Sequence, residues 1–429
     1  MKITCALSDF EFNNLASDLE VVLYGRPNRP EQGSIAATLK HEISQKKLLP
    51  APKAWDLLTI ALSVISADSA GYRTRSPDGW TRDFELTMSV VDQKFWNENA
   101  ALLQQLLAFL TTDRWSLKFI EGGILPKPDK APVLPKEDCV VLLSGGLDSL
   151  IGTIDLVVDG KKPLAVSQRV TPDTKKQALF ARAIGGGLRT FQVNHNIKLP
   201  EKERPQSQRA RSIIFLAYGV FIATTLSRYH SGARVPLYVC ENGFISINPP
   251  LTGSRIGSLS TRTTHPVVFS LLQKILNNSG LNVDIVNPYQ FKTKGEMLNE
   301  CKNPNLRDSL AYKSTSCGRI LSNKIAGEYV HCGRCVPCLV RRAAFHKWKG
   351  VDKTKYYYND IGIQDEKHAG FDDVRSMLIA IAEWEEQGTQ RWLGASLSSA
   401  LIKDKQKISS MIERGMVEIK TLLKAQNVK

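Results

Sequence analysis

The amino-acid sequence predicts an α/β protein whose centre is a parallel, doubly wound sheet. Between residues 139 and 287, short apolar segments alternate with segments of helical periodicity, a pattern that implies parallel strands with helices on both faces. A glycine-containing turn joins the first of these strands to a helix, and ligands of such sheets bind at the carboxyl ends of the strands. With 429 residues, 42% hydrophobic and 23% charged, the composition is that of an ordinary globular protein of two or three domains.

Residues 1–122 are predicted to form an accessory domain of the α+β class. The region contains two apolar segments of helical length and two segments that alternate like strands. We expect helices at Trp55–Ala67 and Ala101–Leu110, and strands at Phe84–Val91 and Trp115–Ile120.

Two further segments flank the central region. Residues 123–138 are expected to form a semi-rigid, extended linker because four prolines lie close together, at Pro126, Pro128, Pro132 and Pro135. Residues 351–429 are predicted to form a helical C-terminal extension, with two or three lysine-rich amphipathic helices from Phe371 onward. No group of residues in this extension suggests a chemical role.

The central region, residues 139–350, carries five predicted strands separated by helices. The strands are expected at Cys139–Leu143, Pro163–Ser167, Arg189–Val193, Val235–Cys240 and Val283–Asn287. The helices are expected at Leu147–Val158, Thr174–Ile184, Gln208–Tyr229 and His265–Asn277. Helices in these places supply the crossover connections that parallel strands need.

The turn after the first of these strands has the features of a phosphate-binding loop. Its residues are Ser144-Gly145-Gly146-Leu147-Asp148-Ser149. Two glycines let the main chain approach an anion closely, and the N–H groups at a helix start can hold a phosphate. Asp148 would repel a phosphate unless a cation lies between them, so we interpret it as a ligand of Mg²⁺. The string lacks the ending of a Walker A loop and resembles the SGGxDS signature of the PP-loop ATP pyrophosphatases.

Four of the eight cysteines are clustered and predict a metal site. They are Cys317, Cys332, Cys335 and Cys338, and their spacing suits a tetrahedral Zn²⁺ bound by four thiolates. Because protein would fill all four positions, the site should be structural, whereas a catalytic zinc keeps one position for water. An iron–sulfur cluster is the main alternative, and His331 could replace one cysteine.

Taken together, SGGLDS and CGRCVPC resemble the QueC family, the 7-cyano-7-deazaguanine synthases, over about half of the chain. Three shorter segments add to the likeness. Ser167 and Gln168 lie where the family has a Gly-Gln-Arg stretch that lines the nucleotide, Arg211–Leu216 is similar to its RNxxFL helix start, and Thr293, Lys294 and Glu296 match its TKxE segment. The resemblance implies a HUP-like PP-loop sheet, and it implies that Cys317 and the three later cysteines bind zinc.

The resemblance also implies an activity. QueC enzymes use ATP and Mg²⁺ to adenylate the carboxylate of 7-carboxy-7-deazaguanine, an amine displaces AMP to give an amide, and a second ATP dehydrates the amide to a nitrile. The candidate catalytic residues are then Asp148, Ser149, Lys294 and Arg211, where the two cations either neutralise developing charge or are ordinary surface residues. The candidate nucleotide-binding residues are Ser144 to Ser149, Ser167 and Gln168.

Two departures from the compact synthase bear on the substrate. The segment Ser260–Pro266 stands where the family has a YPDCR-like patch that recognises the base, and it lacks the acid and the cysteine of that patch. The N-terminal domain and the helical extension are also additions. The enlarged layout is similar to QueC-like proteins of bacterial anti-phage islands, above all the QatC type of the Qat defence system. That likeness implies that the amide is formed with an amine of a partner protein from the same defence operon, and that the reaction stops there.

Two other functions remain open at this stage. Some PP-loop proteins modify tRNA, and the net charge of +15 fits nucleic acid, although no nucleic-acid motif or run of five like charges is present. A non-catalytic, ATP-sensing adaptor is the second alternative. No stretch reaches the ~18 apolar residues of a membrane span, and the first residues have no apolar signal segment. We therefore expect a cytoplasmic protein without a membrane partner.

Overall fold

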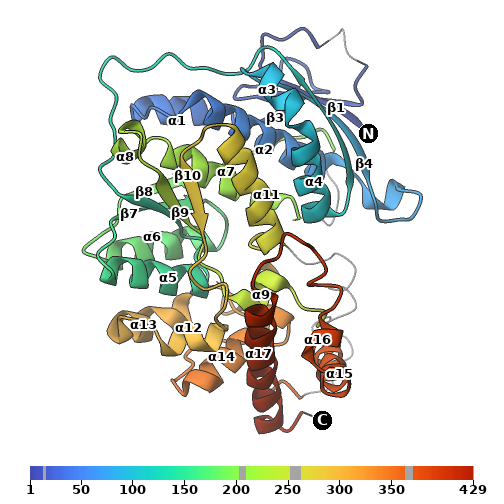
Figure 1. Cartoon of the computed structure of the whole chain (residues 1–429), viewed down its shortest axis with the longest axis vertical. Coiled ribbons are helices and arrows are strands. Elements are labelled where there is room, and N and C mark those ends of the chain that lie inside the picture. The colour runs from blue at the N-terminus through green and yellow to red at the C-terminus, as the bar shows by residue number, and fades with distance from the viewer. Residues whose placement is uncertain (13–15, 202–208, 252–261, 363–370, 429) are drawn as a thin grey trace.

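The computed structural model describes residues 1–12, 16–201, 209–251, 262–362 and 371–428. It is a mixed α/β structure with two five-stranded sheets (Figure 1). All neighbouring strands in both sheets are parallel. The sheets also share one topology, because the orders β3-β2-β1-β4-β5 and β10-β9-β6-β7-β8 both place the first strand of the sheet in its centre.

The N-terminal sheet differs from the expected α+β arrangement, and that prediction was wrong. The expected helices and strands are present as α2 (Pro52–Ala70), α4 (Ala100–Thr111), β4 (Asp83–Ser89) and β5 (Arg114–Ile120). The sequence did not indicate β1 (Lys2–Ala6), β2 (Leu19–Leu23), β3 (Gly33–Ile35), α1 (Leu39–Gln45) or α3 (Gln93–Glu98). The described residues that join β1 to β2 and β2 to β3 form no α-helix, so the alternation that marks a parallel sheet is missing from this part of the sequence.

The second sheet follows the predicted alternation closely. Its strands are β6 (Cys139–Leu142), β7 (Pro163–Gln168), β8 (Thr190–Val193), β9 (Val235–Tyr238) and β10 (Val283–Val286). The helices among them are α5 (Leu147–Val158), α6 (Asp173–Ala183), α7 (Arg211–Ala223), α8 (Ser227–His230), α9 (Gly243–Ile247) and α11 (Pro266–Asn278).

Both faces of this sheet are covered by helices. Along β6 and the residue after it, Val140 and Leu142 belong to the apolar core that contains α7, whereas Val141 and Leu143 belong to the core that contains α5. Successive side chains of a strand point to opposite faces, so the two helices lie on opposite sides of the sheet. This is the doubly wound arrangement that the sequence predicts.

The long helix expected at Gln208–Tyr229 is interrupted, and its start at Gln208 lies outside the described residues. The hydroxyl groups of Thr224 and Thr225 donate to the carbonyl oxygens of Phe221 and Ile222, both at 2.8 Å. Leu226 is extended, and a new short helix, α8, begins after it. Threonine hydroxyls that compete for main-chain carbonyl groups explain why the apolar pattern overestimated the length of this helix.

The two sheets share one continuous apolar core. Helix α2 of the N-terminal half packs against α7, where the rings of Trp55 and Phe221 meet edge to face with centroids 4.6 Å apart. At the edge of the N-terminal sheet, Ser34 in β3 and Lys198 exchange main-chain hydrogen bonds of 2.7 and 2.8 Å. The residues of the predicted linker, 123–138, form no helix or strand.

The last third of the chain is mostly helical and lies below the second sheet in Figure 1. It contains α12 (Lys294–Asn299), α13 (Pro304–Leu310), α14 (Val336–Trp348), α15 (Phe371–Gln387), α16 (Thr389–Trp392) and α17 (Lys405–Ala425). A small antiparallel ribbon, β11 (Lys324–Ile325) and β12 (Glu328–Tyr329), precedes α14. Within the described residues, no helix combines the length and the apolar character that crossing a membrane would require.

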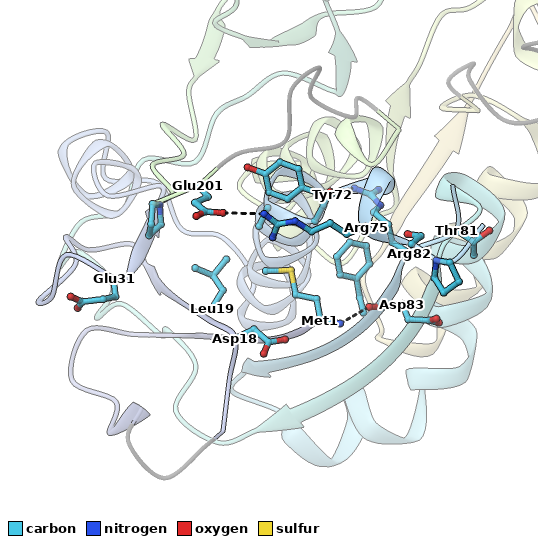
Figure 2. A pocket seen from close by; sticks show the side chains of 16 residues that line it. Met1, Asp18, Leu19, Glu31, Tyr72, Arg75, Thr81, Arg82, Asp83 and Glu201 are labelled. Carbon is cyan, nitrogen blue, oxygen red and sulfur yellow. Dashed lines mark hydrogen bonds and ion pairs between the residues drawn. The ribbon is translucent and has the colours of Figure 1, made fainter. Parts of the chain in front are cut away.

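A cavity of about 760 Å³ opens on the N-terminal sheet (Figure 2). Its lining includes Met1, Leu19 and Asp83, which lie at the amino ends of β1, β2 and β4. Ligands of parallel sheets bind at the carboxyl ends of the strands, so this cavity lies at the wrong edge for the predicted chemistry. The candidate site is therefore sought on the second sheet.

Candidate functional site

The predicted glycine loop, Ser144–Ser149, lies at the carboxyl end of the central strand β6 and opens α5. Gly145 has a φ of +91°, which favours glycine, and a Cβ there would lie 3.1 Å from the Cβ of Asp173. Ser144 and Ser149 brace the loop, with their hydroxyl oxygens 3.1 Å apart. The side chain of Leu147 is buried in the core, so only the main chain of this residue is available to a ligand. The loop thus presents N–H groups of the first turn of α5, which have no partner within the helix.

Asp148 is the centre of a buried polar cluster. Its Oδ1 lies 2.7 Å from Nζ of Lys294, and both side chains are almost fully buried. Its Oδ2 accepts hydrogen bonds from the main-chain N–H of Asn242 at 3.2 Å and from Nδ2 of the same residue at 2.6 Å. The structure therefore brings Asp148 and Lys294, two sequence-predicted residues, into direct contact.

Glu241 completes this cluster, and the sequence analysis did not propose it. It follows β9 and is hydrogen-bonded to Asp148. Burial raises the pKa of Glu241 well above its usual range, and the neighbouring Asp148 charge adds to the effect. Burial would also raise the pKa of Asp148, but Lys294 and the hydrogen bonds from Glu241 and Asn242 outweigh it and lower that pKa. The two shifts run in opposite directions, which favours the proton on Glu241 and the charge on Asp148.

Close packing brings Glu241 to this position. The residue before it, Cys240, lies directly against α5 at Gly152, where an added Cβ would come within 2.4 Å of the cysteine Cβ. Only a residue without a side chain permits such an approach. Asn242 then begins α9, and its side-chain oxygen accepts the N–H of Ile245 at 3.0 Å.

A cavity of about 250 Å³ lies over this cluster. It is bordered by the glycine loop, by Asp148, Glu241 and Lys294, and by Thr315 and Ser316 from the opposite side. The cavity thus combines main-chain N–H donors, one ammonium group and two carboxyl groups, which suits an anion accompanied by a divalent cation.

Arg211 borders a second cavity, of about 210 Å³, on the other side of the loop. Ser144 lines both cavities, and Gln168, Asp173 and Phe215 line the second one. Burial lowers the pKa of Arg211, and the charge of Asp173 partly offsets that effect. The structure thus places Arg211 and Lys294 in adjacent cavities, not in one.

Gln168 and Ser167, at the end of β7, have different surroundings. Gln168 lines the second cavity, and its Nε2 lies 3.1 Å from Nδ1 of His195. Burial and the charge of Arg211 lower the pKa of His195 to about 4, so the imidazole is neutral and can accept a hydrogen bond from the amide. Ser167 is buried and donates to the carbonyl oxygen of Leu143 at 2.7 Å, and it lines neither cavity. Its contacts are those of a residue that supports the sheet.

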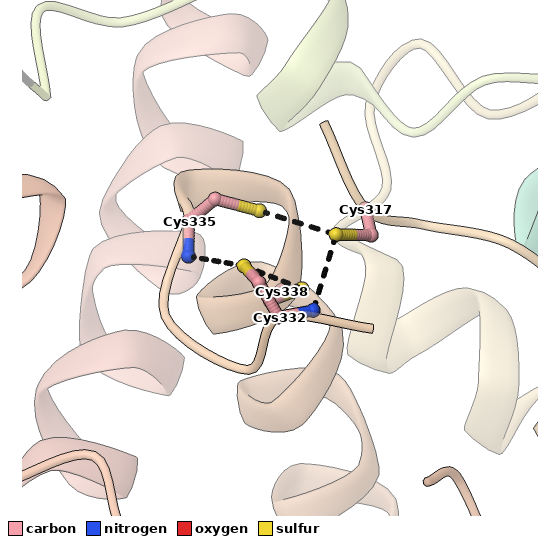
Figure 3. A group of neighbouring side chains, drawn as sticks. All are labelled: Cys317, Cys332, Cys335 and Cys338. Atoms are coloured by element: carbon pink, nitrogen blue, oxygen red, sulfur yellow. Dashed lines mark hydrogen bonds between the residues drawn. The ribbon is translucent and has the colours of Figure 1, made fainter. Parts of the chain in front are cut away.

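The four clustered cysteines form a group that could hold a metal ion such as zinc (Figure 3). All four Sγ atoms lie within 4.8 Å of one another, and the pairs Cys317–Cys335 and Cys332–Cys338 are 3.9 and 3.8 Å apart. Four sulfurs about 2.3 Å from one tetrahedral ion would be about 3.8 Å apart. The spacing suits a single ion, because cysteines that bind different irons of a cluster must stand farther apart.

His331 is not part of this group. Its Nε2 accepts the main-chain N–H of Ser316 at 3.0 Å, and burial lowers its pKa to about 3. The turn between the cysteines depends on Gly333, which has a φ of +92°. A Cβ at that position would lie 2.3 Å from the carbonyl oxygen of Tyr358.

The cysteine group also supports the glycine loop. Thr315, two residues before Cys317, donates its main-chain N–H to the carbonyl oxygen of Gly145 at 3.0 Å. Lys176 in α6 donates to the hydroxyl of Thr315 at 2.5 Å. An ion bound by Cys317 would therefore fix the segment that forms one wall of the cavity of about 250 Å³ over Asp148.

Several residues at the site were missed by sequence reasoning, namely Glu241, Asn242, Asp173, Lys176 and His195. Most of them directly follow a strand or open the next helix, and position at the carboxyl end of a parallel strand is the signal that could have found them. Of the segment Ser260–Pro266, Ser260 and Thr261 lie outside the described residues. His265 caps α11, and Arg262 donates to the carbonyl oxygen of Phe109 at 3.0 Å.

The chain was also compared with known proteins. No protein-family model matches it. No curated protein matches it either.

Proposed function

We propose that this protein is a PP-loop ATP pyrophosphatase that adenylates a carboxylate and passes the acyl group to an amine. The proposal rests on one observation: the glycine loop and the cluster of Asp148, Glu241 and Lys294 line the same cavity. A loop of this kind binds phosphate groups, and a structural loop has no use for a buried acid and an ammonium group beside it.

In the proposed reaction, an oxygen of the substrate carboxylate attacks the α-phosphorus of ATP and the bond to the β-phosphate breaks, releasing pyrophosphate. The amine then attacks the acyl carbon, AMP leaves with the carboxylate oxygen, and the amine loses a proton. The glycine loop holds the departing phosphates through its N–H groups, as a preorganised site for negative charge. Lys294 would supply a cation at the same place, and Arg211, which lines the adjacent cavity, would contact the acyl side of the substrate.

Two bound metals belong to the proposal. The residues that would hold Mg²⁺ are Asp148 and Glu241, whose paired carboxyl groups offer the oxygen ligands that this ion prefers. When bound, the ion neutralises charge on the phosphates. The pKa of Asp148 is lowered and that of Glu241 raised, so binding of the ion would favour release of a proton from Glu241. Zinc at the four cysteines would have a structural role.

We propose 7-carboxy-7-deazaguanine as the carboxylate and an amine of a partner protein, or ammonia, as the acceptor, by resemblance to the QueC family. The enlarged layout supports a place in bacterial anti-phage defence, as in the QatC type of protein. The missing acid and cysteine in Ser260–Pro266 mean that the base would be recognised by other residues than in the compact synthases.

The cysteines count against sulfur transfer to tRNA. Cys240 is the one thiol among the described residues that line the first cavity, and burial raises its pKa far above the usual range. Thiolation needs a reactive thiolate, and a pair of them to relay sulfur. The four clustered cysteines near the site face one another in the group that could hold a metal ion.

The test is a product assay with the full chain, labelled ATP, Mg²⁺ and 7-carboxy-7-deazaguanine, with and without ammonia or a partner protein. AMP and pyrophosphate that depend on the carboxylate, together with an amide product found by mass, would support the proposal. Formation of ADP alone would refute it. ATP binding without any AMP release would favour the adaptor. A free nitrile as the main product would refute the prediction that the reaction stops at the amide.

A further inference from the structure

The C-terminal helix α17 lines neither of the two cavities, but it packs against α9, α12 and α14. Figure 1 shows it beside α14 and below α9, at the base of the molecule. Two of its neighbours begin at the residues that contact Asp148. Asn242 is the N-cap of α9, and Lys294 is the first residue of α12.

Glu418 of α17 reaches the start of α12. It is buried, and its Oε1 accepts a hydrogen bond from the hydroxyl of Thr293, the N-cap of α12, at 2.5 Å. Its carboxyl group also lies against Gly295, where an added Cβ would lie 2.6 Å from the same oxygen. A carboxyl group at this place holds the N-cap residue of α12, directly beside Lys294.

Arg414 makes a second connection one turn earlier on α17. Its Nε lies 2.5 Å from Oε1 of Glu296, and its Nη2 donates to the carbonyl oxygen of Phe291 at 2.9 Å. Glu296 closes the capping box of α12 by accepting the N–H of Thr293 at 2.9 Å. Both connections therefore hold the turn that presents Lys294.

The same helix supports α9 through apolar contacts. Gly415 lies under the ring of Phe244, where an added Cβ would come within 2.3 Å of the ring. Met411 lies against Gly243, the residue after Asn242. Asn242 and Lys294, two of the groups that contact Asp148 from outside α5, thus both begin helices that pack against one face of α17.

We propose that α17 positions the Asp148 cluster, and that Glu418 is the positioning residue for Lys294. Glu418 acts through the cap of α12 and touches no reacting atom. Its effect on turnover rests on the proposed function, whereas its effect on the order of α12 does not. The helical extension is then a working part of the site and not only a surface for partners.

The experiment compares three variants of the full chain with wild type. Glu418→Ala removes the acceptor, Glu418→Gln keeps an oxygen at the same place, and Glu413→Ala, on the exposed face of the same helix, is the matched control. Amide hydrogen exchange of residues 238–248 and 289–300 reports the order of the two supported segments. The kcat and KM for ATP in AMP formation report the site, and metal content and the melting curve report the fold.

We expect Glu418→Ala to speed amide hydrogen exchange in residues 289–300. We also expect it to lower kcat about 5- to 10-fold, the effect of losing a helix cap, and to change KM for ATP less than about 2-fold. Glu418→Gln should restore both, and Glu413→Ala should match wild type. Wild-type behaviour of Glu418→Ala, or a Glu418→Gln variant as impaired as Glu418→Ala, would overturn the proposal.

The design also distinguishes failure of the proposed function from failure of the Glu418→Ala variant to fold. If the wild-type chain releases no AMP, the proposed function fails, and hydrogen exchange alone decides whether α17 orders α12. If Glu418→Ala does not fold, Arg414→Gln takes its place, because that side chain is 44% exposed and lies outside the apolar core. It should speed exchange in 289–300, and unchanged exchange would count against positioning by α17.

Discussion

The neighbouring carboxyl groups of Asp148 and Glu241 give a prediction that can be worked through from the structure. Asp148→Asn removes the charge that pairs with Lys294 at 2.7 Å, where the side chains are 6% and 8% exposed. Removing one partner of a buried ion pair costs about 3–5 kcal/mol, because the other charge is left without a partner. Glu241 changes this value, since it is a second carboxyl group beside the same ammonium group.

We expect Glu241 to hold its proton, because burial and the charge of Asp148 both raise its pKa. In Asp148→Asn that neighbouring charge is gone, so Glu241 can ionise and pair with Lys294 in its place. We therefore expect Asp148→Asn to lower the free energy of unfolding by less than about 2 kcal/mol, and Glu241→Gln by less than about 1 kcal/mol, as for loss of a hydrogen bond. The double variant leaves Lys294 without a charged partner, so its free energy of unfolding should fall by about 3–5 kcal/mol.

The assay is urea unfolding at pH 7 followed by tryptophan fluorescence, for wild type, both single variants and the double variant. The account predicts a double variant that is less stable than the sum of the single variants by about 1–3 kcal/mol. Additive effects, or the full loss in Asp148→Asn alone, would mean that Glu241 does not replace Asp148, and would refute the assignment of the proton to Glu241.

Three other predictions concern the metal group, the loop and pH. Removing metal with a chelator, or the substitution Cys335→Ser, should lower the melting temperature and weaken ATP binding. The reason is that an ion bound by Cys317 would hold Thr315 against Gly145. Elemental analysis measures the metal, and calorimetry measures the melting temperature and ATP binding. Gly145→Ala should weaken ATP binding at least about 10-fold, since it strains a φ of +91° beside Asp173, whereas Gly160→Ala, at a φ of +77° in open space, should keep it. Burial raises the pKa of Glu418, the hydrogen bond from Thr293 partly offsets it, and with the nearby charge of Glu296 the net pKa moves from 4.5 to about 7. The folded state thus binds this proton more tightly than the unfolded chain, and the free energy of unfolding should fall by about 3 kcal/mol as the pH rises from 4.5 through 7. Glu418→Gln should remove that fall in unfolding measured against pH, and an unchanged profile would contradict the cause.

The parts of the site that the sequence predicted are those encoded by neighbouring residues. The glycine loop is six consecutive residues after an apolar strand, and the four cysteines lie within one short segment, so their meeting needs little knowledge of the fold. Lys294 was predicted through a resemblance, and the structure places it against Asp148. The central strands were also predicted, because helices between them mark a parallel sheet.

The remaining features depend on contacts between distant segments. Glu241 meets Asp148 only because β9 lies beside β6 in the sheet, an order that no local pattern encodes. The parallel pairing of β1 to β3 was missed because no α-helix occurs in the described connections between them. Glu418 looks in the sequence like one more acid of an amphipathic helix, and only the packing of α17 on α12 makes it a buried cap.

The central claim, transfer of AMP to a carboxylate, is tested most directly by the fate of the carboxylate oxygen. We would incubate the full chain with ATP, Mg²⁺, an amine and 7-carboxy-7-deazaguanine labelled with ¹⁸O in its carboxyl group, and then weigh the nucleotide products. The account predicts one ¹⁸O in AMP, because the oxygen that attacks the α-phosphorus leaves with it, and predicts no such product with Asp148→Asn. Unlabelled AMP, or label in phosphate with ADP as the nucleotide, would contradict adenylation.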